Sequence, residues 1–187
     1  MKVLIIGSGG REHTLAWKVS QNSKVEKIYA IPGNPGIALL ADCINLDINN
    51  NQEIVKFALD NKIDLTIVGP EVPLTNGLVD ELAEVGLKAF GPTKVAAEIE
   101  GSKAFSKWLM KKYDIPTARF EVFEEAELAK KYVNELGAPI VIKADGLAAG
   151  KGVIIAQTIA EATEAIDSIM CDKAFGSAGH KVVIEEF

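Results

Sequence analysis

A lysine followed by a glycine-rich loop is the strongest chemical feature of the sequence. Lys143 ends an apolar run at residues 140–142, and residues 145–152 contain three glycines and a second lysine, Lys151. A lysine on a rigid strand offers a fixed charge to a phosphate oxygen, and the backbone amides of such a loop bind polyphosphate. The loop is not a Walker A motif, which needs Ser or Thr where Gly152 stands. The segment therefore predicts a phosphate site of another type.

Two other segments contain groups that suit the same site. Gly101-Ser102-Lys103 precedes a helical pattern and offers another lysine. The apolar run at residues 182–187 offers backbone groups and Glu185, which suit the polar edge of an adenine ring. These groups extend the predicted phosphate site toward a nucleotide.

A second glycine-rich segment lies near the N-terminus, at residues 7–13 (GSGGREH). Its amides at the start of a helix would form an anion site. The dinucleotide fingerprint needs glycine where Glu12 stands, and this side chain should hinder close packing of helix on strand. A nicotinamide cofactor is therefore disfavoured. A phosphorylated small molecule fits better, with Arg11 or the amides on its phosphate, and a tight turn without a ligand is the alternative. His13 is expected to cap or pack rather than to catalyse.

Glu71 is a third candidate, because it follows a predicted strand at residues 65–68. Ligands bind at the carboxyl ends of parallel strands in α/β sheets. Held between Pro70 and Pro73, this carboxylate could accept hydrogen bonds from paired ribose hydroxyls. The alternative is a loop glutamate that only faces solvent.

The elements that must position these groups differ between the two halves of the chain. Over residues 1–92, short apolar runs alternate with helical patterns, which predicts an α/β fold with a doubly wound parallel sheet. The predicted strands there are 3–6, 25–31, 43–46, 65–68 and 89–90, and the predicted helices are 13–21, 51–61 and 78–85.

The second half begins with a helical stretch at residues 93–113, broken near Gly101-Ser102. Strands at 140–144 and 153–156 flank the glycine loop and predict an antiparallel hairpin. The remaining predicted elements are strands at 119–123 and 182–187 and helices at 125–136 and 158–170. The final predicted strand reaches the last residue, so we expect its domain to continue beyond Phe187. The alternative is a C-terminal strand at the edge of the sheet.

Composition narrows the function classes further. The 187 residues carry 20 Lys+Arg and 26 Asp+Glu, a net charge of −6, so a nucleic-acid partner is not expected. Cys43 and Cys171 have no metal-binding spacing and are expected to be reduced and mostly buried. No apolar stretch approaches the length that spans a bilayer, so we expect no membrane partner and a cytoplasmic location.

Taken together, the four motifs resemble the glycinamide ribonucleotide synthetase family of the ATP-grasp superfamily. They are residues 7–13, Gly69-Pro70-Glu71, Gly101-Ser102-Lys103 and residues 143–152, in this order along the chain. The resemblance implies a pre-grasp domain at 1–100, a helical linker at 101–118 and a small ATP-grasp lid at 119–187. It also implies a monomer that uses ATP, with Mg²⁺ or Mn²⁺, to join glycine to 5-phosphoribosylamine through glycyl phosphate in purine biosynthesis.

The resemblance also implies a role for each candidate residue. Lys103 and Lys143 would contact ATP phosphates, and the lid would contain Ala149, Gly150, Lys151 and Gly152. The adenine would meet Glu185, Glu186 and Phe187, and the phosphoribosylamine would meet Gly9, Gly10, Arg11 and Glu71. No residue of the chain is assigned a covalent or metal-binding role.

One departure from the family pattern affects the expected activity. ATP-grasp enzymes hold their metal with Glu and Asn or Asp side chains on a sheet beyond the last strand, and Phe187 precedes that sheet. We therefore expect the 187-residue chain alone to be inactive. A non-catalytic nucleotide-binding module and a biotin-carboxylase-type enzyme remain the alternatives.

Overall fold

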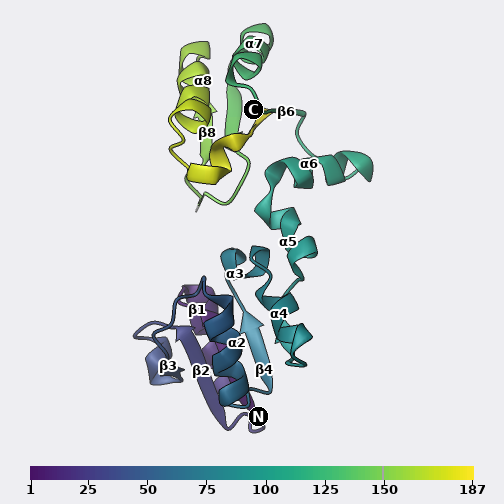
Figure 1. The fold of residues 1–187 in the computed structure, drawn as a ribbon. Helices are drawn as coiled ribbons and strands as arrows, with labels where there is room; N and C mark the ends of the chain where they lie inside the picture. The colour runs from purple at the N-terminus through teal and green to yellow at the C-terminus, as the bar shows by residue number, and fades with distance from the viewer. Residues whose placement is uncertain (149) are drawn as a thin grey trace. The chain divides into compact units, whose positions relative to one another are not determined.

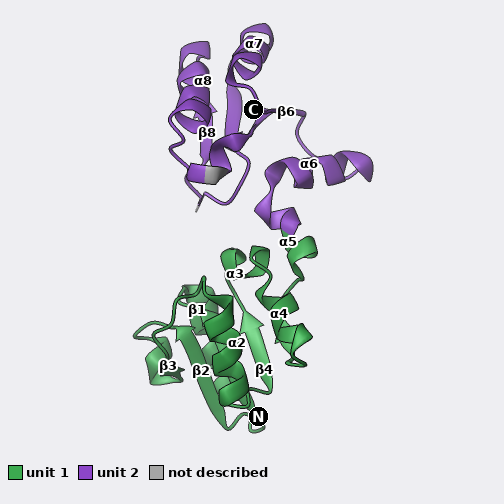
Figure 2. Cartoon of the chain, in the orientation of Figure 1, with its two compact units in different colours: residues 1–97 green, residues 98–187 purple. Residues whose placement is uncertain are grey.

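The computed structural model describes residues 1–148 and 150–187, which fall into two compact units (Figures 1 and 2). Unit 1 is Met1–Ala97 and unit 2 is Glu98–Phe187. Each unit has a sheet and a hydrophobic core of its own. Ala149, predicted to belong to the lid, lies outside the described residues.

Unit 1 contains a parallel sheet in the strand order β3-β2-β1-β4-β5 (Figure 1). Residues 3–6 of the central strand are all buried, because helices cover both faces of the sheet. The sheet confirms the predicted doubly wound α/β fold. Its strands are β1 (Lys2–Gly7), β2 (Lys27–Pro32), β3 (Asp42–Cys43), β4 (Leu65–Val68) and β5 (Ala89–Phe90).

The helices of unit 1 divide between the two faces of its sheet. Ile54 and Ala58 of α2 and Leu82 of α4 pack on one face, and Ala16 of α1 packs on the other with a 3₁₀ turn at Ile37–Leu39. Full burial of one such isoleucine contributes about 2 kcal/mol. The helices are α1 (Gly10–Ser20), α2 (Asn51–Asp60), α3 (Glu71–Thr75) and α4 (Leu78–Glu84).

Two local predictions for unit 1 were wrong. Helix α1 begins at Gly10 rather than at residue 13, because Glu12 caps its N-terminus and offsets the low helix propensity of glycine. Strand β3 is shorter than predicted and ends at Cys43. The alternative of a loop glutamate at Glu71 was also wrong, because Glu71 opens the short helix α3, in which Pro70 and Pro73 are tolerated at the N-cap and in the first turn.

Unit 2 contains an antiparallel sheet in the strand order β6-β9-β7-β8. Strands β7 and β8 pair directly, which confirms the predicted hairpin around the glycine loop. Strand β9 lies between β6 and β7, so the alternative of a C-terminal edge strand was wrong. The strands are β6 (Phe120–Phe123), β7 (Ile140–Ala144), β8 (Val153–Ala156) and β9 (Val182–Glu186).

The two faces of this second sheet differ in composition. Ile140, Ile142 and Ile184 point to one face and pack against α7 and α8. Because side chains alternate along a strand, Lys143 and Glu185 point to the opposite face. Helix α5 (Lys94–Gly101) begins in unit 1 and ends in unit 2. The other helices and turns of unit 2 are α6 (Lys103–Lys112), α7 (Ala126–Leu136), α8 (Ile159–Ile166), a π turn at Asp167–Cys171 and a 3₁₀ turn at Gly176–His180.

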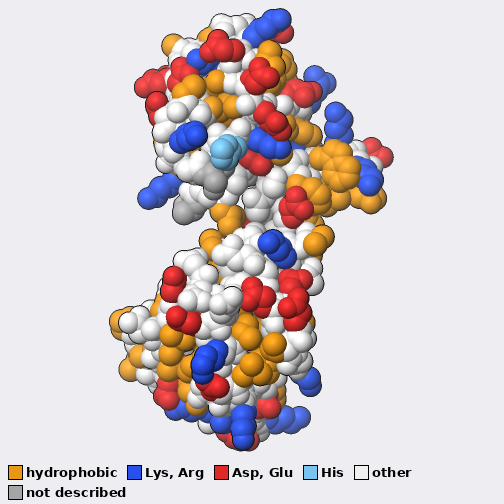
Figure 3. All heavy atoms as spheres, viewed as in Figure 1, with side chains coloured by type: hydrophobic (Ala, Val, Ile, Leu, Met, Phe, Trp, Pro, Cys, Tyr) orange, Lys and Arg blue, Asp and Glu red, His pale blue; other side chains and the backbone are white. Residues whose placement is uncertain are grey.

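The surface of each unit carries charges of both signs interspersed on the face shown in Figure 3. Both cysteines are free, but Cys171 is exposed and Cys43 is only partly buried, so the prediction of mostly buried thiols was wrong. Within the described part of the chain, the search for a helix of membrane-spanning length and apolarity found none.

Candidate functional site

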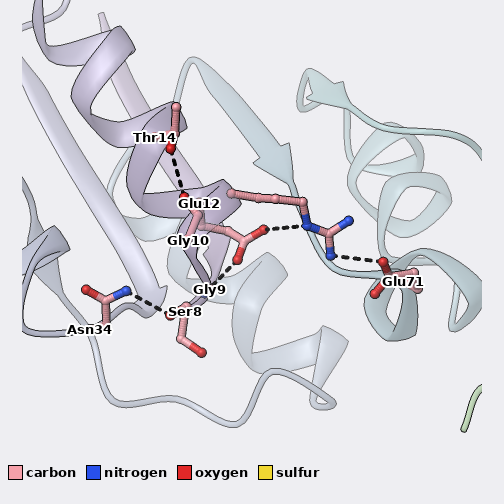
Figure 4. A network of polar contacts seen from close by, with 8 residues as sticks. Ser8, Gly9, Gly10, Glu12, Thr14, Asn34 and Glu71 are labelled. Atoms are coloured by element: carbon pink, nitrogen blue, oxygen red, sulfur yellow. Dashed lines mark hydrogen bonds and ion pairs between the residues drawn. The ribbon is translucent and has the colours of Figure 1, made fainter. Parts of the chain in front are cut away.

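Glu12 organises the N-terminal loop of unit 1 from a buried position. Its side chain is only 4% exposed, and its Oε2 accepts a 2.7 Å hydrogen bond from the amide of Gly9 (Figure 4). A Cβ added to Gly7 or Gly69 would come within 2.6 Å or less of the same side chain. The prediction that Glu12 hinders packing of the helix on the strand was therefore wrong: glycines on neighbouring segments leave the space that its carboxylate fills.

Arg11 and Glu71, predicted from separate motifs, meet in the structure. The Arg11 guanidinium lies 2.9 Å from Glu71 Oε1, and its Nε lies 3.9 Å from Glu12 Oε1 (Figure 4). Arg11 projects from the first turn of α1, and Glu71 from the first residue of α3. Gly10 lies beside them at the start of α1, and its carbonyl accepts a hydrogen bond from Thr14. The carboxyl ends of β1 and β4 thus bring one cation and one anion to the same edge.

Asn34 is a residue of this edge that the sequence analysis did not single out. Its amide nitrogen donates to the carbonyl of Ser8 at 2.8 Å (Figure 4), and its oxygen accepts from the amide of Ile37. The turn that follows β2 is thereby tied to the glycine loop. A Cβ on Gly36 in this turn would lie 2.5 Å from His13, which supports the packing role expected of that histidine.

The pKa of Glu71 is lowered from its usual value near 4.5, first by a backbone hydrogen bond and then by Arg11. Stability from this carboxylate is therefore present above about pH 4.5 and is lost as the pH falls through the lowered value. The side chain is 34% exposed, so we expect only about 0.5 kcal/mol. Glu71→Gln should flatten the acid limb of a melting-temperature profile, whereas Glu84→Gln, at an exposed position of α4, should leave it unchanged. An identical acid limb in both variants would contradict this assignment.

In unit 2, Lys143 shares a carboxylate with a second lysine. Its Nζ lies 2.8 Å from Glu185 Oε2, and Nζ of Lys107 on α6 lies 3.0 Å from the same oxygen. The Glu185 side chain is only 6% exposed, while that of Lys143 is 24% exposed. The carboxylate predicted to meet an adenine edge thus lies between two ammonium groups on the face of the sheet opposite α7 and α8.

Lys103 lies at the base of the glycine loop. Its ammonium donates to the carbonyls of Asp145 and Gly146, at 3.3 and 2.9 Å. The Asp145 carboxylate in turn accepts from Ser102 and from the amide of Ala104 at 2.7 Å, which fixes the start of α6 to the loop. Burial lowers the pKa of Lys103, and the charge of Asp145 opposes that shift.

The described residues of the loop itself are held by few contacts. Gly150 is exposed and adopts φ +76°, a conformation that favours glycine. Lys151 is exposed, and its amide donates to the carbonyl of Ala148. The carbonyl of Gly152 accepts from the amide of Ala144 at 2.8 Å and closes the base of the hairpin. Gly150 and Lys151 are thus left in solvent.

The last two predicted site residues are Glu186, which ends β9, and Phe187, which follows it. Glu186 Oε1 accepts a 2.9 Å hydrogen bond from the amide of Arg119, next to β6. Phe187 is 71% exposed. Val153 and Ile155 of β8, on the same face as Lys143, are also exposed, at 44% and 52%. The β7–β8 part of this face therefore combines a cation with exposed apolar side chains.

Metal binding has no comparable support. Among the described residues, no group of three His, Cys, Asp or Glu side chains could hold a metal ion. The described side chains of unit 2 instead offer ammonium groups, which suit phosphate oxygens.

Two family models match the chain, one after the other. Residues 1–100 match "Phosphoribosylglycinamide synthetase, N domain", and residues 101–187 match "Phosphoribosylglycinamide synthetase, ATP-grasp (A) domain". The chain belongs to the phosphoribosylglycinamide synthetase family. This membership confirms the resemblance inferred from the four motifs.

Individual relatives within the phosphoribosylglycinamide synthetase family agree. A phosphoribosylamine–glycine ligase of Halalkalibacterium halodurans is 56% identical over the whole chain. The solved phosphoribosylamine–glycine ligase of Thermotoga maritima is 32% identical, with a TM-score of 0.80 over the whole chain. The chain spans only 44% of the length of each of these proteins. The biotin carboxylase domain of the Hydrogenobacter thermophilus 2-oxoglutarate carboxylase, at 23% identity and a TM-score of 0.79, shares the fold.

Lys107, which pairs with Glu185 beside Lys143, is a second residue that motif reading missed. It stands four residues after Lys103, so both lysines lie on one face of α6. That spacing, together with the acidic Glu185 in an otherwise apolar strand, was the available indication. It did not identify the strand that would receive Lys107, because strand order is not encoded in local spacing.

Proposed function

We propose that this chain forms the nucleotide-binding and phosphoribosylamine-binding parts of an ATP-dependent ligase. The ligase joins glycine to 5-phosphoribosylamine and produces glycinamide ribonucleotide. The observation that carries the proposal is the cluster of Lys103, Lys107 and Lys143 beside a glycine-rich hairpin loop. Membership of the phosphoribosylglycinamide synthetase family supports the substrates.

Unit 2 supplies the nucleotide site in this proposal. Lys143 binds an ATP phosphate from its strand, and Lys103 binds another from the start of α6. Burial disfavours the charged form of Lys103, and the negative charge of a nearby polyphosphate would stabilise that form. The loop formed by Ala149–Gly152 contributes amides and Lys151. The adenine lies near the backbone of Glu185, Glu186 and Phe187, and exposed Val153 and Ile155 offer apolar contact.

Unit 1 supplies the phosphoribosylamine site. Arg11 binds the 5′-phosphate, assisted by the helix N-terminus at Gly9 and Gly10. Because the Gly9 amide already donates a hydrogen bond to Glu12, Arg11 and the amides after Gly9 provide most of the contacts to the phosphate. Glu71 accepts hydrogen bonds from the ribose hydroxyls and stays ionised, since its pKa is lowered. Its 2.9 Å contact with Arg11 places the two ligand groups side by side, where one ribose phosphate can meet both.

The reaction proposed for the whole protein has two steps. A glycine carboxylate oxygen bonds to the γ-phosphorus of ATP while the β–γ bridging bond breaks, and ADP leaves. The amine of phosphoribosylamine then attacks the carbonyl carbon, the acyl–oxygen bond breaks, phosphate leaves, and the amine loses a proton. The lysines of unit 2 act by positioning and by neutralising phosphate charge, so no covalent nucleophile is needed.

The proposal also covers the domain organisation, cellular location, oligomeric state and metal of the protein. Residues 1–100 form the pre-grasp domain, 101–118 the helical linker and 119–187 the small ATP-grasp lid. The protein works as a cytoplasmic monomer on small molecules. Mg²⁺ or Mn²⁺ accompanies ATP, and we assign none of its ligands to the described residues, which do not form such a site.

Binding of the two ligands to the purified chain tests the proposal. Mg·ATP and ribose 5-phosphate, which keeps the phosphate and the ribose hydroxyls, should each raise the melting temperature. Arg11→Met should weaken ribose 5-phosphate binding about tenfold and leave Mg·ATP binding unchanged, because one charge-assisted contact is lost. Lys18→Met removes an exposed cation from the same helix and should change neither.

Two other results would change the assignment. Binding of Mg·ATP without ribose 5-phosphate would favour a nucleotide-binding module over the ligase. Binding of neither ligand would contradict both parts of the proposed site.

A further inference from the structure

The pairing of two lysines with one buried carboxylate requires an explanation beyond phosphate binding. Glu185 is 95% buried, and its Oε2 contacts both Lys107 and Lys143. Its other oxygen, Oε1, is buried and has no hydrogen-bond partner among the described residues. A buried carboxylate is stable only while a cation stays close to it. Without Lys107, the move of Lys143 to a phosphate would leave the charge of Glu185 uncompensated.

The contacts of the two lysines show which one stays. Lys107 is 12% exposed, donates to the Thr117 hydroxyl at 2.6 Å and lies over the Phe120 ring at 5.6 Å. Lys143 is twice as exposed, at 24%, and stands at the end of β7 beside the glycine loop. Lys107 is therefore held on several sides, while Lys143 is the cation that can exchange partners.

We propose that Lys107 is a positioning residue that neutralises Glu185 and so releases Lys143 to an ATP phosphate. The inference rests on the proposed nucleotide site and adds a residue that does not itself touch the nucleotide. Glu185 holds Lys143 in place before binding. When phosphate arrives, Lys143 exchanges the carboxylate for the phosphate, and Lys107 keeps Glu185 paired. The site thereby binds a polyanion beside a buried carboxylate of the same sign.

Substitutions at Lys107 test this arrangement through nucleotide affinity. Lys107→Met should raise the Kd for Mg·ATP about tenfold, since Glu185 then retains Lys143 as its remaining partner. Glu185→Gln in the same chain should return the Kd to within about threefold of the original, because a neutral amide does not compete for Lys143. Lys107→Gln, whose amide can keep the hydrogen bond to Thr117, serves if the methionine variant fails to fold.

A matched control lies one turn further along α6. Lys111 also lies over the Phe120 ring, at 5.9 Å, but no ion pair with Glu185 is found for it in the described structure. Lys111→Met removes the same charge from the same helix and should leave the Kd unchanged. A double variant as weak as Lys107→Met would mean that Lys107 contacts phosphate directly, and an unchanged Kd in Lys107→Met would also overturn the proposal.

A second measurement needs no nucleotide and separates this inference from the proposed function. The acylation rate of Lys143 by an amine-specific reagent is measured by peptide mass spectrometry, with exposed Lys131 as reference. Lys107→Met should slow acylation of Lys143 about threefold, and adding Glu185→Gln should restore it. If the original chain does not bind Mg·ATP, the nucleotide site fails. An unchanged acylation rate would instead overturn the role of Lys107.

Discussion

Replacing Lys143 by methionine is expected to weaken Mg·ATP binding by about 30-fold to 150-fold. The loss corresponds to about 2–3 kcal/mol, the value of a hydrogen bond to a charged group. The fold should survive, because Lys107 still pairs with Glu185 at 3.0 Å and the apolar face of β7 is untouched. Isothermal titration calorimetry on the purified chain measures the effect directly.

The control for this variant is the other lysine of the hairpin. Lys151 is exposed and belongs to the loop rather than to a strand, so its ammonium is less well positioned. Lys151→Met should weaken binding by about threefold or less. If both variants lose the same affinity, long-range charge rather than a fixed contact holds the nucleotide. High salt would then abolish the difference from the original chain.

Replacing Gly69 by alanine is expected to destabilise unit 1 by about 2–3 kcal/mol. A Cβ at this position would lie 2.2 Å from Glu12 Oε1 and 2.8 Å from its Cδ. The carboxylate has little room to move, because Gly7 and Gly9 border it on other sides. Glu12 would have to leave its pocket and give up the hydrogen bond to the Gly9 amide. Denaturant unfolding of the chain gives the free energy.

Two further variants show whether Glu12 is the cause. Gly10→Ala should cost less than about 0.5 kcal/mol, because a Cβ there meets nothing within 4 Å. Adding Gly69→Ala to a Glu12→Ala chain should cost much less than it does in the original chain, with a coupling of at least about 1 kcal/mol. Equal costs in both backgrounds would attribute the effect to the backbone of the turn instead.

Local patterns predicted most of the fold because they depend on short-range physics. Buried runs such as residues 65–68 and the hairpin around the glycine loop carry their signals within a few residues. The errors arose where tertiary contacts determine the bounds of an element or its place in a sheet. Helix α1 starts at Gly10 because Glu12 finds a pocket, and β9 is internal because β6, about 60 residues earlier, pairs with its free edge.

For the candidate site too, local patterns located single residues but did not predict the contacts between them. Motif spacing located Lys103, Lys143, Arg11 and Glu71, because each stands at the end of a predictable element. It did not show that Arg11 reaches Glu71, since that contact joins two separate βα units. Nor did it identify Lys107, whose importance depends on which strand lies beside α6.

The position of β9 has a consequence for synthesis on the ribosome. The sheet of unit 1 is complete once residue 90 has emerged, so that unit can fold early. The sheet of unit 2 has a gap between β6 and β7 that only residues 182–186 fill. Until then the nascent chain exposes unpaired strand edges and the apolar residues of β7, a condition that favours aggregation. Ribosome pausing shortly before this segment would prolong that exposure.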